Sequence, residues 1–191
     1  MNDSEPSLRI HLGCWKRYLP GFVHVDLCDF PHIDYRHDIA TLPMFADGSA
    51  ELVYASHCLE YFDREQAREV LREWGRVLRP GGILRVAVPD FPALVKVYEA
   101  TGDIQRILGP IYGRMEIQEG ERRPRCLYHK TVYDFRSLEQ VLLECGYFNV
   151  SRYDWRQTLH KDFDDHSQAY FPHMDKDHGM LVSLNVEATK P

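Results

Sequence analysis

The sequence lacks the long apolar runs that a membrane-spanning helix requires. No run approaches the ~18 consecutive apolar residues that such a helix needs, and residues 1–7 are polar and acidic rather than hydrophobic. We therefore expect no membrane partner and no secretory signal peptide, and we expect a cytoplasmic protein.

Cysteine is scarce and shows no metal-binding spacing. The five cysteines are odd in number and include no CxxC pair. A disulfide framework and a zinc site are therefore not expected, whereas scattered reduced thiols are typical of cytosolic proteins. These cysteines are Cys14, Cys28, Cys58, Cys126 and Cys145.

Basic residues are not in excess. The chain has 23 Lys and Arg against 29 Asp and Glu, which gives a formal net charge of −6. A broad nucleic-acid-binding surface needs the opposite balance, so we expect no nucleic-acid partner.

The glycine-rich fingerprint of dinucleotide-binding proteins is also absent. The segment 13–17 reads Gly-Cys-Trp-Lys-Arg and has one glycine, and only nine residues separate Gly13 from Val23. A crossover between parallel strands usually takes at least ~10–12 residues, so the first crossover helix should be short or missing. A pyrophosphate needs a full helix N-terminus beneath it. These features disfavour a nicotinamide-dependent oxidoreductase and favour a nucleoside cofactor without a pyrophosphate.

Two short apolar runs end in residues that suit such a cofactor. The run 8–12 stops at Gly13, and the run 23–25 stops at Asp26. A glycine allows the backbone to come close to a ligand, because it has no Cβ. A carboxylate at the tip of the next strand can accept hydrogen bonds from a ribose diol. The pair therefore predicts a nucleoside site at the carboxyl ends of two parallel strands.

Strands and helices alternate along the 191 residues, which predicts an α/β fold with residues 1–191 forming one domain. A helix is expected from Asp63, because Asp63 with Gln66 resembles a capping box and an apolar stripe follows at helical spacing. A loop or lid is expected at about 109–127, and its basic run 122–125 suits either a surface charge cluster or contact with an acidic acceptor. Further strands are expected at 50–56, 83–88, 148–153 and 180–188, and a second helix at 135–145.

The order of six short motifs resembles the class I S-adenosylmethionine-dependent methyltransferases. Within that class the chain is most similar to small bacterial predicted methyltransferases with a shortened first crossover. The resemblance implies a doubly wound, Rossmann-like sheet that is mostly parallel with an antiparallel last strand. It also implies S-adenosylmethionine as cofactor and S-adenosylhomocysteine as product. The motifs are Leu12-Gly13-Cys14, Val25-Asp26, Asp38-Ile39-Ala40-Thr41-Leu42-Pro43, Asp47-Gly48-Ser49, Ala55-Ser56-His57-Cys58-Leu59-Glu60 and Arg79-Pro80-Gly81-Gly82.

The resemblance assigns a role to each matching position. Gly13 would lie along the methionine moiety, and Asp26 would accept the ribose hydroxyls. Asp38 would face the adenine amino group, with the Ile39 amide opposite a ring nitrogen. Residues 56 and 57 would border the sulfonium. The expected cofactor-binding residues are Gly13, Cys14, Trp15, Asp26, Leu27, Asp38, Ile39, Ser56 and His57.

Trp15 departs from the pattern, because the family usually has glycine there. The indole would either pack on the cofactor or close the methionine side of its pocket, or block the site; alternatively, the short loop would point it outward. An open site gives an enzyme that methylates a small-molecule acceptor, such as a sugar or a sugar nucleotide. A blocked site gives a non-catalytic protein on the same fold.

Histidine is the expected general base if the acceptor is a hydroxyl. His129 is the first candidate and His57 the second, although either could instead serve only to cap a loop. The stretch 157–178 is rich in His and Asp, but it completes no metal-ligand motif, so a solvated polar connection is expected there and no metal is predicted.

Overall fold

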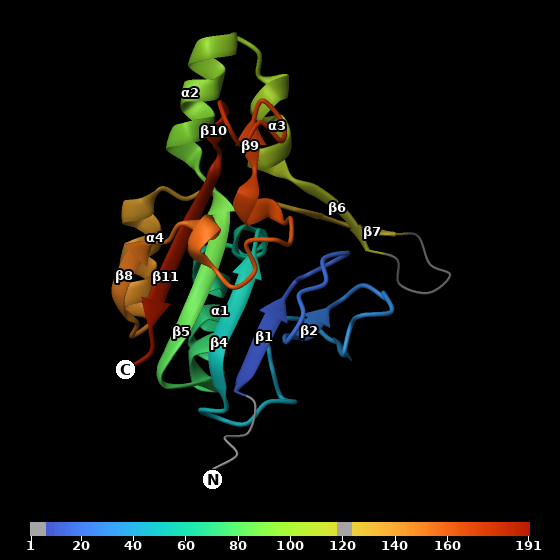
Figure 1. The fold of residues 1–191 in the computed structure, drawn as a ribbon, viewed down its shortest axis with the longest axis vertical. Coiled ribbons are helices and arrows are strands. Elements are labelled where there is room, and N and C mark those ends of the chain that lie inside the picture. Colours follow the sequence, from blue (N-terminus) through green and yellow to red (C-terminus); the bar gives the residue numbers. More distant parts are fainter. Residues whose placement is uncertain (1–6, 118–123) are drawn as a thin grey trace.

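The computed structural model describes residues 7–117 and 124–191. Its described residues form a seven-stranded sheet in the order β3-β2-β1-β4-β5-β11-β8 (Figure 1). The strands from β3 to β5 are parallel, and β11 runs antiparallel to both of its neighbours. The expected α/β fold with an antiparallel last strand is therefore confirmed. The strands are β1 (Leu8–Leu12), β2 (Val23–Asp26), β3 (Tyr35–Arg36), β4 (Ala50–Ser56), β5 (Leu78–Pro89), β8 (Phe148–Arg152) and β11 (Ser183–Thr189).

Two helices, α1 (Arg64–Val77) and α4 (Phe135–Glu144), cover one face of this sheet (Figure 1). The α1 helix begins as the sequence predicts, because the Asp63 carboxylate accepts from the Gln66 amide and the Gln66 side chain accepts from the Asp63 amide. This reciprocal capping satisfies donors that a helix N-terminus otherwise leaves free.

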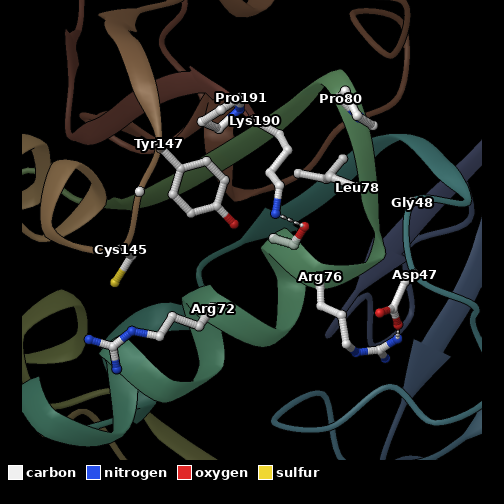
Figure 2. Close-up of a pocket in the computed structure, with 12 residues that line it drawn as sticks. Asp47, Gly48, Arg72, Arg76, Leu78, Pro80, Cys145, Tyr147, Lys190 and Pro191 are labelled. Atoms are coloured by element: carbon white, nitrogen blue, oxygen red, sulfur yellow. Dashed lines mark hydrogen bonds and ion pairs between the residues drawn. The ribbon is translucent and has the colours of Figure 1, made fainter.

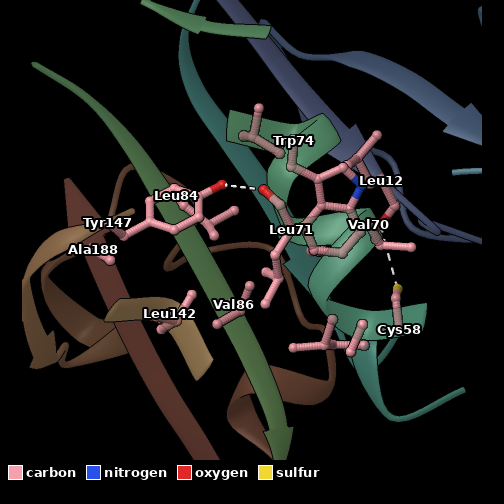
Figure 3. Close-up of a cluster of buried hydrophobic side chains, with 14 of the residues drawn as sticks. Leu12, Cys58, Val70, Leu71, Trp74, Leu84, Val86, Leu142, Tyr147 and Ala188 are labelled. Atoms are coloured by element: carbon pink, nitrogen blue, oxygen red, sulfur yellow. Dashed lines mark hydrogen bonds between the residues drawn. The ribbon is translucent and has the colours of Figure 1, made fainter. Parts of the chain in front are cut away.

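The main hydrophobic core lies between these helices and the sheet. Two polar groups in it have partners: Tyr147 Oη donates to the Leu71 carbonyl at 2.7 Å, and Trp74 Nε1 donates to the Ile39 carbonyl at 2.8 Å. Buried polar groups need such partners, so these bonds fix how α1 packs. Figure 3 shows part of this cluster, with Leu12, Val70, Leu71, Trp74, Leu84, Val86, Leu142 and Ala188 in contact across the layers.

The opposite face of the sheet is covered by the short first crossover and by residues 155–182. No helix forms between β1 and β2, as expected for nine residues. The 155–182 segment contains the 3-10 helices η2 (Trp155–Gln157) and η3 (His166–Gln168) and the strands β9 (Tyr170–Phe171) and β10 (Met180–Leu181). The prediction of a solvated connection is wrong for part of this segment, because His160 and Asp165 are buried against Tyr54.

The segment between β5 and α4 also differs from the prediction of a loop at 109–127. It contains the helices α2 (Phe91–Thr101) and α3 (Gln105–Tyr112), followed by a two-stranded ribbon of β6 (Arg114–Ile117) and β7 (Arg125–Tyr128). The ribbon extends over the carboxyl ends of β1 and β2 (Figure 1). Of the basic run at 122–125, residues 122 and 123 lie outside the described residues. In the described part of the chain no helix is long and apolar enough to cross a membrane.

Candidate functional site

Gly13 follows β1 directly and occupies a backbone position that only glycine fits. Its φ is 61°, and its amide donates to the Val25 carbonyl at 2.9 Å. A Cβ at this position would lie 2.3 Å from Cys58 Sγ, far closer than packed atoms allow. The chain therefore turns tightly at the end of β1, where a ligand can approach the backbone closely.

Asp26 ends β2 beside this turn, and its carboxylate is held by the backbone. Oδ2 accepts from the Trp15 amide and Oδ1 from the Cys28 amide, both at 2.7 Å. Each carboxylate oxygen has a second lone pair. The side chain is thus preorganised to accept two further hydrogen bonds from a diol.

A cavity of about 840 Å³, here called the Asp26 cavity, opens at these strand ends. Its walls come from the ends of β1 and β2, from the segment after β3, from α1 and from the ribbon. Six of the residues that the sequence predicts for the cofactor line it: Gly13, Asp26, Leu27, Asp38, Ile39 and His57.

A second cavity of about 630 Å³, here called the His129 cavity, lies next to the first. It contains the other predicted residues, Cys14, Trp15, Ser56 and His129. Its walls also include η3 and the first residues of β6. The two cavities adjoin, because four residues line both of them: Gly13, His57, Tyr61 and Met115.

Trp15 lies at the rim of the His129 cavity. Its backbone has a positive φ of 46°, which is uncommon for a residue with a side chain. Its indole is 38% exposed, with Lys16 Nζ 4.6 Å from the ring centre and the Phe30 ring 6.4 Å away. The residues that line the Asp26 cavity do not include Trp15.

His129 and His57 lie on either side of Glu60, which belongs to the 3-10 helix η1 (Leu59–Tyr61). The Glu60 carboxylate oxygen Oε1 is 3.4 Å from His57 Nδ1 and 3.8 Å from His129 Nε2. Burial lowers the pKa of both histidines, and burial raises the pKa of Glu60 to about 8. A buried histidine pair with low pKa values is unprotonated at neutral pH, which suits a general base.

Sequence reasoning did not identify Glu60. It ends the motif Ala55–Glu60 and is an acidic residue in a largely apolar stretch, Leu59-Glu60-Tyr61-Phe62, but neither signal predicts a role for it. The contact that indicates a role for Glu60 is with His129, which lies far from it along the chain. Sequence periodicity therefore could not predict this contact.

The rest of the wall of the His129 cavity is mixed, and its exposed lining is more apolar than polar. Its charged side chains have partners within the protein: Arg17 Nη1 lies 3.8 Å from Asp164 Oδ2, and Arg114 is paired with Glu116. Together with His166, the lining side chains Arg17, Arg114 and Glu116 offer both donors and acceptors to a ligand. Such a wall suits a molecule that has both apolar surface and polar groups.

A third cavity, of about 610 Å³, opens at the opposite end of the sheet, where β4 and β5 begin (Figure 2). Two of its charged groups are already engaged within the protein. Arg76 donates to Asp47 at 2.6 Å, and Lys190 Nζ donates to the Gly75 carbonyl at 2.9 Å. None of the residues predicted from the sequence for cofactor binding or catalysis lines it.

Comparisons with known proteins agree with this geometry. Residues 22–86 match the family model described as a methyltransferase domain. No curated protein sequence matches the chain.

Similar solved structures include a putative methyltransferase from Haloferax volcanii in complex with the Trm112 methyltransferase activator (18% identity, 100% of this chain and 85% of that chain, TM-score 0.55). A SAM-dependent methyltransferase from Archaeoglobus fulgidus is also similar (13% identity, 96% of this chain and 86% of that chain, TM-score 0.56). A third similar structure is the Burkholderia thailandensis 1,6-didemethyltoxoflavin-N1-methyltransferase, with 1,6-didemethyltoxoflavin and S-adenosylhomocysteine bound (12% identity, 96% of this chain and 72% of that chain, TM-score 0.50). At these identities the likeness shows the fold.

Proposed function

We propose that this chain is a class I S-adenosylmethionine-dependent methyltransferase that methylates a small molecule, such as a sugar or a sugar nucleotide; its fold and the methyltransferase model that matches residues 22–86 support this class. The observation that carries this proposal is the shared wall between the Asp26 cavity and the His129 cavity. One cavity has the groups that a nucleoside needs, and the adjoining cavity of about 630 Å³ has room for a separate acceptor.

The residues of the Asp26 cavity fit S-adenosylmethionine. The free lone pairs of Asp26 suit the ribose diol, and Gly13, which lines the same cavity, suits the methionine moiety. Asp38 and Ile39, in the same wall, suit the adenine edge. When bound, S-adenosylmethionine supplies an activated methyl group, and its product is S-adenosylhomocysteine.

The protein would contribute mainly position and the exclusion of water. Holding the acceptor in line with the methyl group replaces an encounter in solution with a reaction between fixed partners. The ribbon and the η3 segment wall the His129 cavity and so limit the access of water.

His129 is the proposed general base. Its Nδ1 lies 2.9 Å from the Pro110 carbonyl, which can only accept, so the ring proton is on Nδ1. Nε2 is therefore the free acceptor nitrogen, and it can take a proton from an acceptor hydroxyl. His57, which lines both cavities, is the second candidate.

The alternative of a non-catalytic protein would need Trp15 to fill the cofactor cavity. Its indole is instead placed beside Phe30 and Lys16, and it does not line the Asp26 cavity. This placement favours the enzyme.

Titration calorimetry with S-adenosylhomocysteine and, separately, with NAD tests the cofactor. We expect binding of the first and none of the second. A panel of sugars and sugar nucleotides is then incubated with S-adenosylmethionine, and the release of S-adenosylhomocysteine is measured, with the Asp26→Ala variant as control. Failure to bind S-adenosylhomocysteine would overturn the proposal, and turnover only on proteins or nucleic acids would refute its acceptor class.

A further inference from the structure

Glu60 is a buried acidic residue that no hydrogen bond accounts for. Its side chain is fully buried, and within residues 7–117 and 124–191 neither carboxylate oxygen has a hydrogen-bond partner. Its backbone carbonyl accepts from the Lys130 amide at 2.8 Å, which ties η1 to the segment after β7. An ionised carboxylate without partners is costly to bury, so this position needs either a proton or a facing cation.

The hydrogen bonds of His57 fix which of its nitrogens carries the proton. His57 Nε2 lies 3.0 Å from Ser183 Oγ, and Ser183 Oγ donates to Asn185 Oδ1 at 2.9 Å. The Asn185 amide group is oriented in turn, because its Nδ2 donates to the Ser167 carbonyl at 2.8 Å. Ser183 therefore accepts from His57, so His57 carries its proton on Nε2 and leaves Nδ1 bare.

His129 also has one ring nitrogen without a proton, and a different hydrogen bond determines which one. Its Nδ1 donates to the Pro110 carbonyl, which leaves Nε2 bare. The bare nitrogens of both histidines thus face Oε1 of Glu60, at 3.4 Å and 3.8 Å. Three acceptor atoms directed at one another repel unless a proton lies among them.

The other titratable groups around Glu60 do not supply that proton. Lys130, whose amide donates to the Glu60 carbonyl, directs its ammonium to Gln66 Oε1 at 2.8 Å, and Arg64 donates to Thr131 and to the Val132 carbonyl. Burial raises the pKa of the Cys58 thiol and of the Tyr61 and Tyr133 phenols. Burial also lowers the pKa of the neighbouring His166. The titratable groups that interact with Glu60, directly or through one of the two histidines, are His57, Cys58, Tyr61, His129, Tyr133 and His166.

We propose that His57, Glu60 and His129 hold one proton in common, and that Glu60 is the positioning residue that lets His129 act as the base. This inference rests on the proposed function. During transfer, the acceptor hydroxyl would give its proton to His129 Nε2 while Glu60 passes its own proton to His57 Nδ1. The Glu60 carboxylate would then face two imidazolium rings.

The step balances in bonds and in charge. The acceptor oxygen forms its bond to the methyl carbon, and the electron pair of the broken carbon–sulfur bond remains on sulfur. The positive charge that the sulfonium loses appears on His57, Glu60 and His129 together, because two imidazolium rings and one carboxylate carry one net positive charge. The extra proton leaves to solvent after the product departs.

The test is a pH titration of the histidine Cε1 resonances by NMR, on the protein without cofactor or acceptor. In the wild type, His57 and His129 should show a step near pH 8, where Glu60 ionises, although their own pKa values lie below 6.5. In Glu60→Gln this step should be absent, because the amide does not titrate. The exposed His178 serves as the internal reference in every sample.

Glu60→Asp provides the second variant and keeps a titrating carboxyl, so its spectra should retain a step in the alkaline range. The proposal is overturned if the wild type shows no step between pH 7 and 9, or if the step persists in Glu60→Gln. Because no ligand is present, these outcomes are independent of the S-adenosylhomocysteine titration that tests the proposed function.

Discussion

The carboxylate of Asp26 accepts a hydrogen bond from the Trp15 amide at 2.7 Å. This contact joins the tip of β2 to the first turn after β1, across a crossover that has no helix. The backbone of the turn is therefore held by the same side chain that is expected to bind the ribose. The Asp26 carboxylate thus stabilises the conformation of this short crossover.

Replacing Asp26 with alanine should weaken S-adenosylhomocysteine binding. The pair of charge-assisted hydrogen bonds to the ribose would be lost, and the pair is worth about 1.5–3 kcal/mol, so the dissociation constant should rise by about tenfold or more. Titration calorimetry measures this change. Asp29→Ala is the matched control, because Asp29 lies in the same loop with its side chain largely exposed, and it should bind as the wild type does. Equal affinity of the two variants would remove Asp26 from the site.

Trp15→Gly distinguishes an obstructing indole from one at the rim. Since Trp15 does not line the Asp26 cavity, the variant should bind S-adenosylhomocysteine no more tightly than the wild type. The exposed indole also loses its packing beside Phe30, so a modest weakening is expected as the turn loosens. A tenfold gain in affinity would instead indicate that the indole competes with the cofactor, and it would favour the non-catalytic alternative.

The sequence predicts best where one local signal decides the structure. The α1 helix has a capping box and an uninterrupted apolar stripe, and its start at Arg64 is confirmed. The helices α2 and α3 were missed for physical reasons. Only Ala93, Leu94 and Val97 of α2 are buried, and Pro110 inside α3 reads as a helix breaker. Neither helix has a side-chain N-cap bond.

The site residues likewise include some that local sequence signals predict and others that depend on tertiary contacts. Gly13 and Asp26 could be identified because each ends a strand, and parallel strands bring their carboxyl ends together. The role of Glu60 depends on His129, which reaches it only because the ribbon folds back over the sheet. A contact of this kind arises from tertiary packing and leaves no periodic pattern in the sequence.

Tyr54→Phe should destabilise the fold by removing one buried hydrogen bond. Tyr54 Oη donates to Asp165 Oδ2 at 2.5 Å, and this bond anchors the 155–182 segment to the sheet. Leaving a buried carboxylate oxygen without this donor costs about 1–3 kcal/mol. Urea unfolding followed by circular dichroism measures the loss. Tyr112→Phe, at an exposed tyrosine, is the control and should unfold like the wild type. Identical midpoints for both variants would show that the anchor contributes nothing.

His129→Ala should lower turnover by ~10²–10⁴ while the affinity for S-adenosylhomocysteine stays nearly constant, because the residue acts on the acceptor. His178→Ala, at an exposed histidine, should retain full turnover. The wild-type rate should rise with pH as His129 loses its proton. Because burial lowers the pKa of His129, the neutral base is already formed below pH 6.5, and the rise should level off before that value is reached. Initial rates on an acceptor found in the sugar screen measure both effects. Full turnover by His129→Ala, or a rate that rises only above pH 7, would show that His129 is not the base and that positioning alone carries the transfer.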